Sequence, residues 1–204
     1  MERSRVSGAL KPRKKPMQGR STATVDAILE AAIRILRADG WGQLTTTRVA
    51  ARAGVSVGSL YQYFPSREAI AAALVRRRTH QLLEAVLASD LSGVVGRDDA
   101  IQRLMSAFLT EKRRDLELSL ALRDVLPDVR GRQAILEEMR TFLPALQDKL
   151  AAAPGRRPDP TRLAMAMAAV EGAVWEALAQ EAGLLDRPAM VASLSRVFEA
   201  ALGD

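Results

Sequence analysis

The sequence predicts an all-α fold, and three observations support this prediction. From residue 22 onward, apolar residues recur at three- and four-residue spacing, which is the period of a helix with a buried face. Ser, Thr, Asp, Gly and Pro stand at the ends of these periodic segments, where helices begin and end. No segment shows the alternation of a strand, and the chain has no internal repeat. We therefore expect about nine helices.

Residues 1–89 are expected to hold a flexible arm and four helices. Residues 1–20 combine Pro, Gly and basic residues without periodicity, which is typical of a flexible basic arm or of a merely solubilising tail. Gly40 and Gly42 end the first helix, and Thr45 or Thr46 begins the second. The expected helices cover 22–39, 45–53, 56–64 and 66–89.

Residues 90–204 are expected to be mostly helical as well. Pro127 is expected to break the chain between two helices and Pro144 to kink one. Asp159 followed by Pro160 is typical of a helix start. The expected helices cover 100–112, 113–126, 129–152, 161–181 and 188–202, with loops at 90–97 and 151–160.

Composition excludes several classes of function. The 204 residues contain no cysteine and one histidine, so we expect no disulfide, no thiol chemistry and no metal site. There is no glycine-rich phosphate loop and no evident pair of catalytic carboxylates, so we expect neither an enzyme with catalytic residues nor a cofactor. Residues 163–179 carry two glutamates, which disfavours a membrane span. The first twenty residues have no apolar core of the signal-peptide type. A cytoplasmic protein is expected.

Charge is distributed unevenly along the chain. Residues 1–20 carry +6, residues 21–80 carry +4 and residues 81–204 carry −4. This asymmetry indicates that the N-terminal part meets a polyanion and that the remainder has another task. Charge alone does not separate DNA from RNA or from an anionic membrane surface, although the Pro/Gly-broken arm lacks the amphipathic pattern of a membrane-surface helix.

Residues 45–64, TTTRVAARAGVSVGSLYQYF, have the form of a helix-turn-helix. Two short helices flank a turn at Gly54, and apolar residues suit a small core. The second helix opens with Ser56, Val57, Gly58 and Ser59, which are small enough to let its tip approach base edges in a major groove. An ordinary pair of packed helices is the alternative.

These residues resemble the tetracycline-repressor (TetR) family of bacterial transcription regulators. The resemblance covers about residues 22–75 and rests on LTTTRVAARAGVSVGSLYQYFPSREAI at 44–70, with a weak match in residues 81–204. It implies a helix-turn-helix DNA-binding domain at 21–67, after the arm at 1–20, and a helical effector-binding and dimerisation domain at 68–204. It also implies a repressor that binds double-stranded DNA at an inverted-repeat operator.

The resemblance further implies roles for single residues. Phosphate contacts would come from Thr46, Thr47, Tyr61, Tyr63 and Arg67, and Arg48 would reach a phosphate or the groove edge. Base contacts would come from Val57, Gly58, Ser59 and Gln62, with Ser56 beside them. The first turn of the recognition helix lacks arginine and asparagine, so base reading would rely on Gln62, on water or on DNA shape.

Two further expectations concern the second domain. The helix at 161–181 is apolar almost all round between Leu163 and Val174, so we expect it, with residues 188–201, to be buried in a homodimer; the centre of a monomeric bundle is the alternative. A pocket for a small, mostly apolar effector would use residues that otherwise form core: Leu104, Met105, Phe108, Leu118, Leu122, Arg123, Met139, Phe142, Met165, Glu171 and Trp175.

The expected function is thus a homodimeric, sequence-specific repressor released from DNA by a ligand, through a population shift that the helix at 66–89 carries between the domains. The rival is a nonspecific architectural DNA-binding protein without an effector. A nonspecific architectural protein would not need the mildly acidic second domain at 81–204, and it should show no preferred DNA sequence.

Overall fold

The computed structural model describes residues 20–125, 131–152 and 157–203 and confirms the all-α fold. These residues form nine α-helices and two short 3-10 helices, and no strand occurs among them. Within the same residues, no helix combines the length and apolar character needed to cross a membrane. Expected and observed helix bounds agree to within about three residues.

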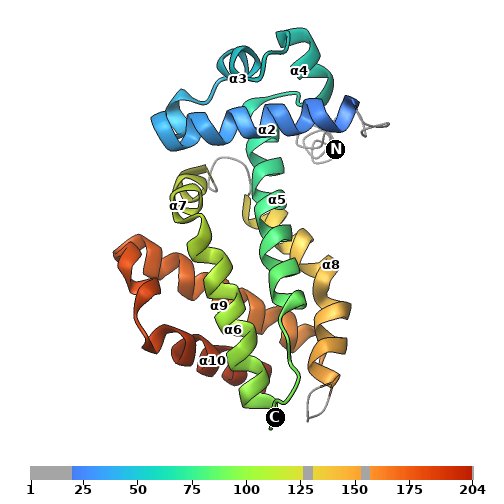
Figure 1. Ribbon diagram of the computed structural model, residues 1–204, viewed down its shortest axis with the longest axis vertical. Coiled ribbons are helices and arrows are strands. Elements are labelled where there is room, and N and C mark those ends of the chain that lie inside the picture. Colours follow the sequence, from blue (N-terminus) through green and yellow to red (C-terminus); the bar gives the residue numbers. More distant parts are fainter. Residues whose placement is uncertain (1–19, 126–130, 153–156, 204) are drawn as a thin grey trace, which may run out of the picture. The chain divides into compact units, whose positions relative to one another are not determined.

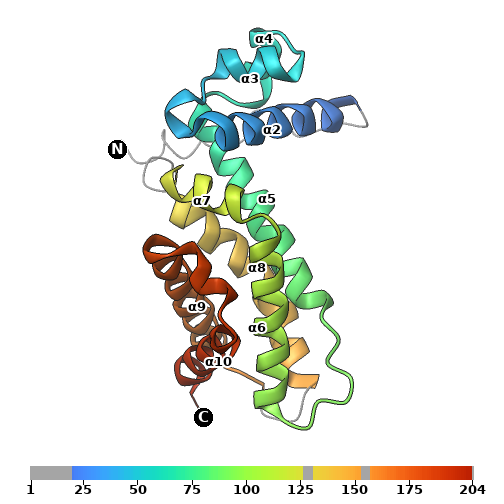
Figure 2. The same ribbon diagram turned by 60° about the vertical axis from the view of Figure 1, so that its left-hand side comes forward.

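The described residues cluster into two compact units. The first unit contains α2 (Arg20–Asp39), the 3-10 turn η1 (Trp41–Gln43), α3 (Thr46–Ala53), α4 (Val57–Tyr63), α5 (Arg67–Ala88) as far as Arg77, and α7 (Leu116–Val125) from Glu117. Helix α3 packs against α2 and α4, and both views show α3 and α4 together on one side of α2 (Figures 1 and 2). The core of the first unit is formed by fully buried side chains: Ile28, Ile35, Leu36, Leu44, Val49, Leu60, Phe64 and Ile70.

The second unit contains the rest of α5 from Arg78, α6 (Arg97–Arg114), most of α8 (Gly131–Ala152), α9 (Pro160–Gln180), η2 (Ala182–Asp186) and α10 (Ala189–Leu202). Helix α10 packs against both α9 and α6. The carboxylate of Asp159 caps α9 by accepting from the N–H groups of Thr161 and Arg162, with Pro160 at the first helical position, as expected. Pro144 lies within α8, and Pro127 lies outside the described residues.

Helix α9 buries one face within its own chain rather than its whole circumference. Leu163, Met167 and Val174 are buried, whereas Met165 is 60% exposed. Residues two apart on a helix point about 200° away from each other, so Met165 cannot share the side of its neighbours at 163 and 167. An apolar outer face therefore remains on α9 in the single chain.

Candidate DNA-binding and effector sites

The turn of the helix-turn-helix is built by two local devices. Gly54 adopts the left-handed conformation, with φ 68° and ψ 29°, and its N–H returns to the carbonyls at the end of α3. A side chain with a Cβ is strained there, so glycine closes α3 at low cost. The Ser56 hydroxyl accepts from the Ser59 N–H at 3.0 Å and caps α4. These two residues set where α4 begins.

Helix α4 divides sharply into a buried and an exposed face. Leu60 of α4 is fully buried, as is Val49 of α3, the helix against which α4 packs. On the other side Val57 is 38% exposed and Tyr61 is 42% exposed, with Ser56, Gly58 and Gln62 exposed beside them. These residues lie together at the start and along the free side of α4, which suits contact with a partner surface.

Gly58 has no intramolecular reason to lack a side chain. It lies in the first turn of α4, and a Cβ built there would come near only the Ser56 hydroxyl, at 3.9 Å. Glycine inside a helix costs stability relative to alanine. Open space in front of the backbone fits the close approach of a ligand such as a DNA groove.

Hydroxyl groups from two helices meet beside this face. The hydroxyls of Thr46 at the start of α3 and Tyr61 on α4 lie 3.2 Å apart, and Thr47 is exposed next to them. Such a pair, next to a helix N-terminus, is suited to a phosphate. Tyr63 is different: it is half-buried, and its hydroxyl accepts from Ser21 of α2, so it also links two helices of the unit.

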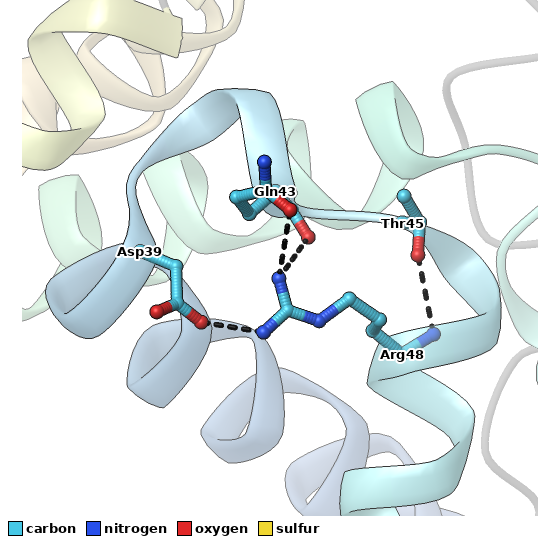
Figure 3. Close-up of polar contacts among 4 residues, drawn as sticks. All are labelled: Asp39, Gln43, Thr45 and Arg48. Carbon is cyan, nitrogen blue, oxygen red and sulfur yellow. Dashed lines mark hydrogen bonds and ion pairs between the residues drawn. The ribbon is translucent and has the colours of Figure 1, made fainter.

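Arg48 is held by its own chain (Figure 3). Its guanidinium donates to the carbonyl and the side-chain oxygen of Gln43, at 3.1 and 3.2 Å, and pairs with Asp39 at 2.5 Å. The backbone N–H of Arg48 donates to the Thr45 hydroxyl that caps α3. This side chain therefore ties α3 to the end of α2 and to η1, a link that sequence spacing did not indicate.

Arg67 lies at the start of α5 and is oriented by two neighbours. Its guanidinium stacks over the Trp41 ring at 4.4 Å, and its Nε pairs with Glu68 at 3.0 Å. Burial acts to raise the pKa of Glu68, but hydrogen bonds from its own backbone N–H, Ser66 and Arg67 outweigh it and lower that pKa. Glu68 is thus ionised at neutral pH and holds Arg67 in place.

Arg52 was not among the residues that the sequence singled out. It is exposed in the last turn of α3, one turn after Arg48, and among the described residues no ion pair or hydrogen bond engages it. A cation without a partner in the described part of the chain is available for a phosphate. The signal was a second arginine at i+4 on the same helix face.

The second unit contains a narrow cavity of about 50 Å³. Most of its lining is apolar, and it comes from α5, α6, α8, α9 and α10. The described lining residues are Thr79, Leu82, Leu83, Val86, Leu104, Met105, Phe108, Met139, Leu146, Met167, Val170, Glu171 and Phe198. Leu104, Met105, Phe108, Met139 and Glu171 were expected in a pocket, whereas the contributions of α5 and α10 were not.

The other expected pocket residues lie elsewhere. Leu118 and Leu122 are buried in α7, which belongs to the first unit, and the side chain of Arg123 lies outside the described residues. Phe142 packs edge-on against the His80 ring at 5.0 Å, and Met165 faces outward on α9. Helical period alone did not tell which apolar side of each helix would face the cavity.

A buried ion pair lies at the wall of the cavity. Lys112 of α6 is 6% exposed, and its Nζ donates to Glu171 Oε1 of α9 at 2.6 Å. The same ammonium lies over the rings of Trp175 at 4.8 Å and Phe108 at 5.7 Å. Trp175 thus holds the ion pair and is not among the described residues that line the cavity.

The geometry defines a class of fold: a helix-turn-helix unit joined to a second helical unit that contains a mostly apolar cavity. Residues 28–74 match the family described as bacterial regulatory proteins, tetR family. The nucleoid occlusion factor SlmA of Actinobacillus pleuropneumoniae serotype 5b (strain L20) is 41% identical over 63 residues, or 30% of this chain. That match spans 31% of SlmA, so the chain covers about a third of the curated relatives it matches.

Solved structures extend the likeness to nearly the whole fold. A tetR-family transcription regulator from Shewanella sp. PV-4 is 19% identical with a TM-score of 0.62, covering 88% of this chain and 97% of that one. FadR from Bacillus subtilis, solved with stearoyl-CoA, is 19% identical with a TM-score of 0.60 over 87% and 97% of the two chains. The family match thus covers the helix-turn-helix unit, and the likeness over the rest of the chain is one of fold.

Proposed function

We propose that this protein is a homodimeric repressor that binds an inverted-repeat operator and is released from it by a small molecule in the second unit. The observation that carries the proposal is the exposed tip of α4, where Gly58 leaves the backbone open and Val57, Tyr61 and Gln62 project beside it. A recognition helix enters the major groove with such a face.

The proposed DNA contacts fall into two groups. Thr46, Thr47, Tyr61, Arg67 and Arg52 would contact phosphates and fix the position of α4 on the duplex. Base reading would rest on the second group: Val57, Gly58, Ser59 and Gln62, with Ser56 at the cap. Arg48 and Tyr63 would contribute mainly by holding α3 and α4 against α2, because both already bond within the unit.

The proposed dimer would form through the outer faces of α9 and α10. Met165 on α9 and Val197 on α10 are large apolar side chains left exposed by the single chain. Gly172 lies two turns after Met165 on the same face of α9 and is exposed, and nothing lies within 4 Å of a Cβ there, so a partner helix could approach closely. Twofold symmetry would place two α4 helices on half-sites about 34 Å apart.

Ligand release would act through α5, which is continuous from Arg67 to Ala88. Thr79, Leu82 and Val86 of α5 line the cavity. Two consecutive arginines hold the helix in each unit: Arg77 pairs with Asp26 and Glu30 of α2, and Arg78 pairs with Glu111 of α6 at 2.6 Å. A ligand that prefers another placement of α5 would shift the population away from the DNA-binding state. The complex of B. subtilis FadR with stearoyl-CoA supports a ligand in this fold.

The proposal is tested by selecting purified protein against a random duplex library at about physiological salt and sequencing the bound fraction. We expect an inverted repeat with half-sites one helical turn apart. Recovery of no common sequence, with binding that disappears as salt rises, would instead establish a backbone-only, architectural DNA-binding protein.

A further inference from the structure

We propose that the cavity of the second unit selects an uncharged ligand, apolar along most of its length, that donates one hydrogen bond to the carboxylate of Glu171. This inference rests on the proposed effector role of the cavity and names the ligand class. Among the described lining residues, Glu171 is the one with a charge, and Thr79 is the one other side chain with a polar group.

The carboxylate of Glu171 has an acceptor to spare. Its Oε1 accepts from Lys112, and among the described residues no other donor reaches the group. An ionised carboxylate accepts at both oxygens, so Oε2 remains for a donor in the cavity. A hydroxyl or amide N–H of a ligand supplies that donor, whereas an ether or a hydrocarbon does not.

Lys112 is not available to receive an anionic ligand in place of Glu171. Its ammonium is fixed by the carboxylate at 2.6 Å and by the faces of Trp175 and Phe108. Lys112 is also absent from the described lining, so an anion in the cavity meets the carboxylate of Glu171 first. Two like charges in direct contact within an apolar wall repel each other strongly.

Charge balance disfavours a cationic ligand too. The Lys112–Glu171 pair is neutral as a whole, and both side chains are largely buried, at 7% and 15% exposure. A ligand cation bound to Oε2 would leave one uncompensated positive charge in a lining that is otherwise apolar. Burying an unpaired charge costs several times more than burying a hydrogen-bonded neutral group.

Flexible methionine side chains allow the cavity to widen around a ligand. A free volume of about 50 Å³ is too small for an eight-carbon ligand, so lining side chains must move to admit one. Met105, Met139 and Met167 line the cavity from three different helices. Methionine side chains are unbranched and change rotamer readily, so they yield to varied apolar shapes. The same three methyl groups report directly on anything that enters.

The test uses four probes with one eight-carbon chain: 1-octanol, octyl methyl ether, octanoate and octylammonium. Each is titrated into the full-length protein carrying ¹³C-methyl methionine, and shifts of the cavity methionines are followed by NMR without DNA. We expect 1-octanol to bind roughly 10-fold more tightly than the ether, because the ether cannot donate to a charged acceptor. Octanoate and octylammonium should bind more weakly than octanol.

Two variants locate the effect. In Lys112→Leu/Glu171→Leu, which removes both charges together, octanol and the ether should bind equally well. In Thr79→Val, a matched loss of the other polar lining group, the preference for octanol should persist. Equal binding of octanol and ether to the unaltered protein, tightest binding of octanoate or octylammonium, or no response of the cavity methionines to any probe would each overturn the proposal. Operator binding is measured separately, so octanol that binds without releasing DNA would refute the effector role and leave the ligand class standing.

Discussion

Gly58 gives the sharpest test at the scale of a single residue. Since a Cβ fits there without contact closer than 3.9 Å, Gly58→Ala should raise the free energy of unfolding by about 0.5–1 kcal/mol through helix propensity. The added methyl would stand between α4 and the base edges, so operator affinity should fall roughly 10-fold. Urea unfolding and fluorescence anisotropy on the selected operator measure the two effects.

The contrasting substitution is Gly54→Ala. Gly54 has a positive φ of 68°, so alanine should lower the free energy of unfolding by about 1 kcal/mol or more.

A Gly58→Ala protein that is stabilised and still binds its operator normally would show that α4 does not approach DNA by its tip.

The two arginines of α3 should differ in what they do on DNA. Arg52→Gln removes a cation that no described residue pairs, so the slope of log affinity against log salt should become shallower by about 1. Arg48→Gln removes a side chain occupied by Asp39 and Gln43, so it should lower stability by less than about 1 kcal/mol, since the pair is half-exposed, and leave the slope nearly unchanged. Salt titrations of both variants make the comparison; an equal loss of slope would assign Arg48 to a phosphate.

At the scale of the elements, α9 shows what sequence can and cannot predict. Its start was predictable because Asp159 and Pro160 act locally, as do Gly54 and Ser56 at the turn. The helix that covers each apolar side of α9 could not be predicted, because that depends on helices distant in sequence. For the same reason the sequence did not predict that Lys112 pairs with Glu171, 59 residues away, or that α5 lines the cavity.

The outer face of α9 leads to a prediction about assembly. Met165→Glu places a charge on the proposed dimer face, where it would be buried without a partner, so the dimer dissociation constant should rise at least 100-fold, by roughly 3 kcal/mol or more. Val95→Glu is the matched control, since Val95 is 90% exposed in the loop before α6. Sedimentation equilibrium compares the two. A dimer that survives Met165→Glu would place the interface elsewhere, and a control that also dissociates would reveal a general charge effect.

For the whole molecule, charge and affinity are linked through salt. The first 18 residues carry six Lys/Arg and one Glu, ahead of a helix-turn-helix that presents hydroxyls, amides and few unpaired cations. Each phosphate neutralised by a cation contributes about 0.9 to the slope of log affinity against log salt.

Removing residues 1–18 should therefore weaken operator binding and flatten the slope of log affinity against log salt by several units. The preference for the operator over a scrambled duplex should stay nearly constant, because the base-reading face on α4 is retained. Anisotropy titrations on both duplexes from about 50 to 200 mM salt measure slope and preference together. An unchanged slope would mean that the arm does not contact DNA, and a collapsed preference would make the arm, rather than α4, the main reader of sequence.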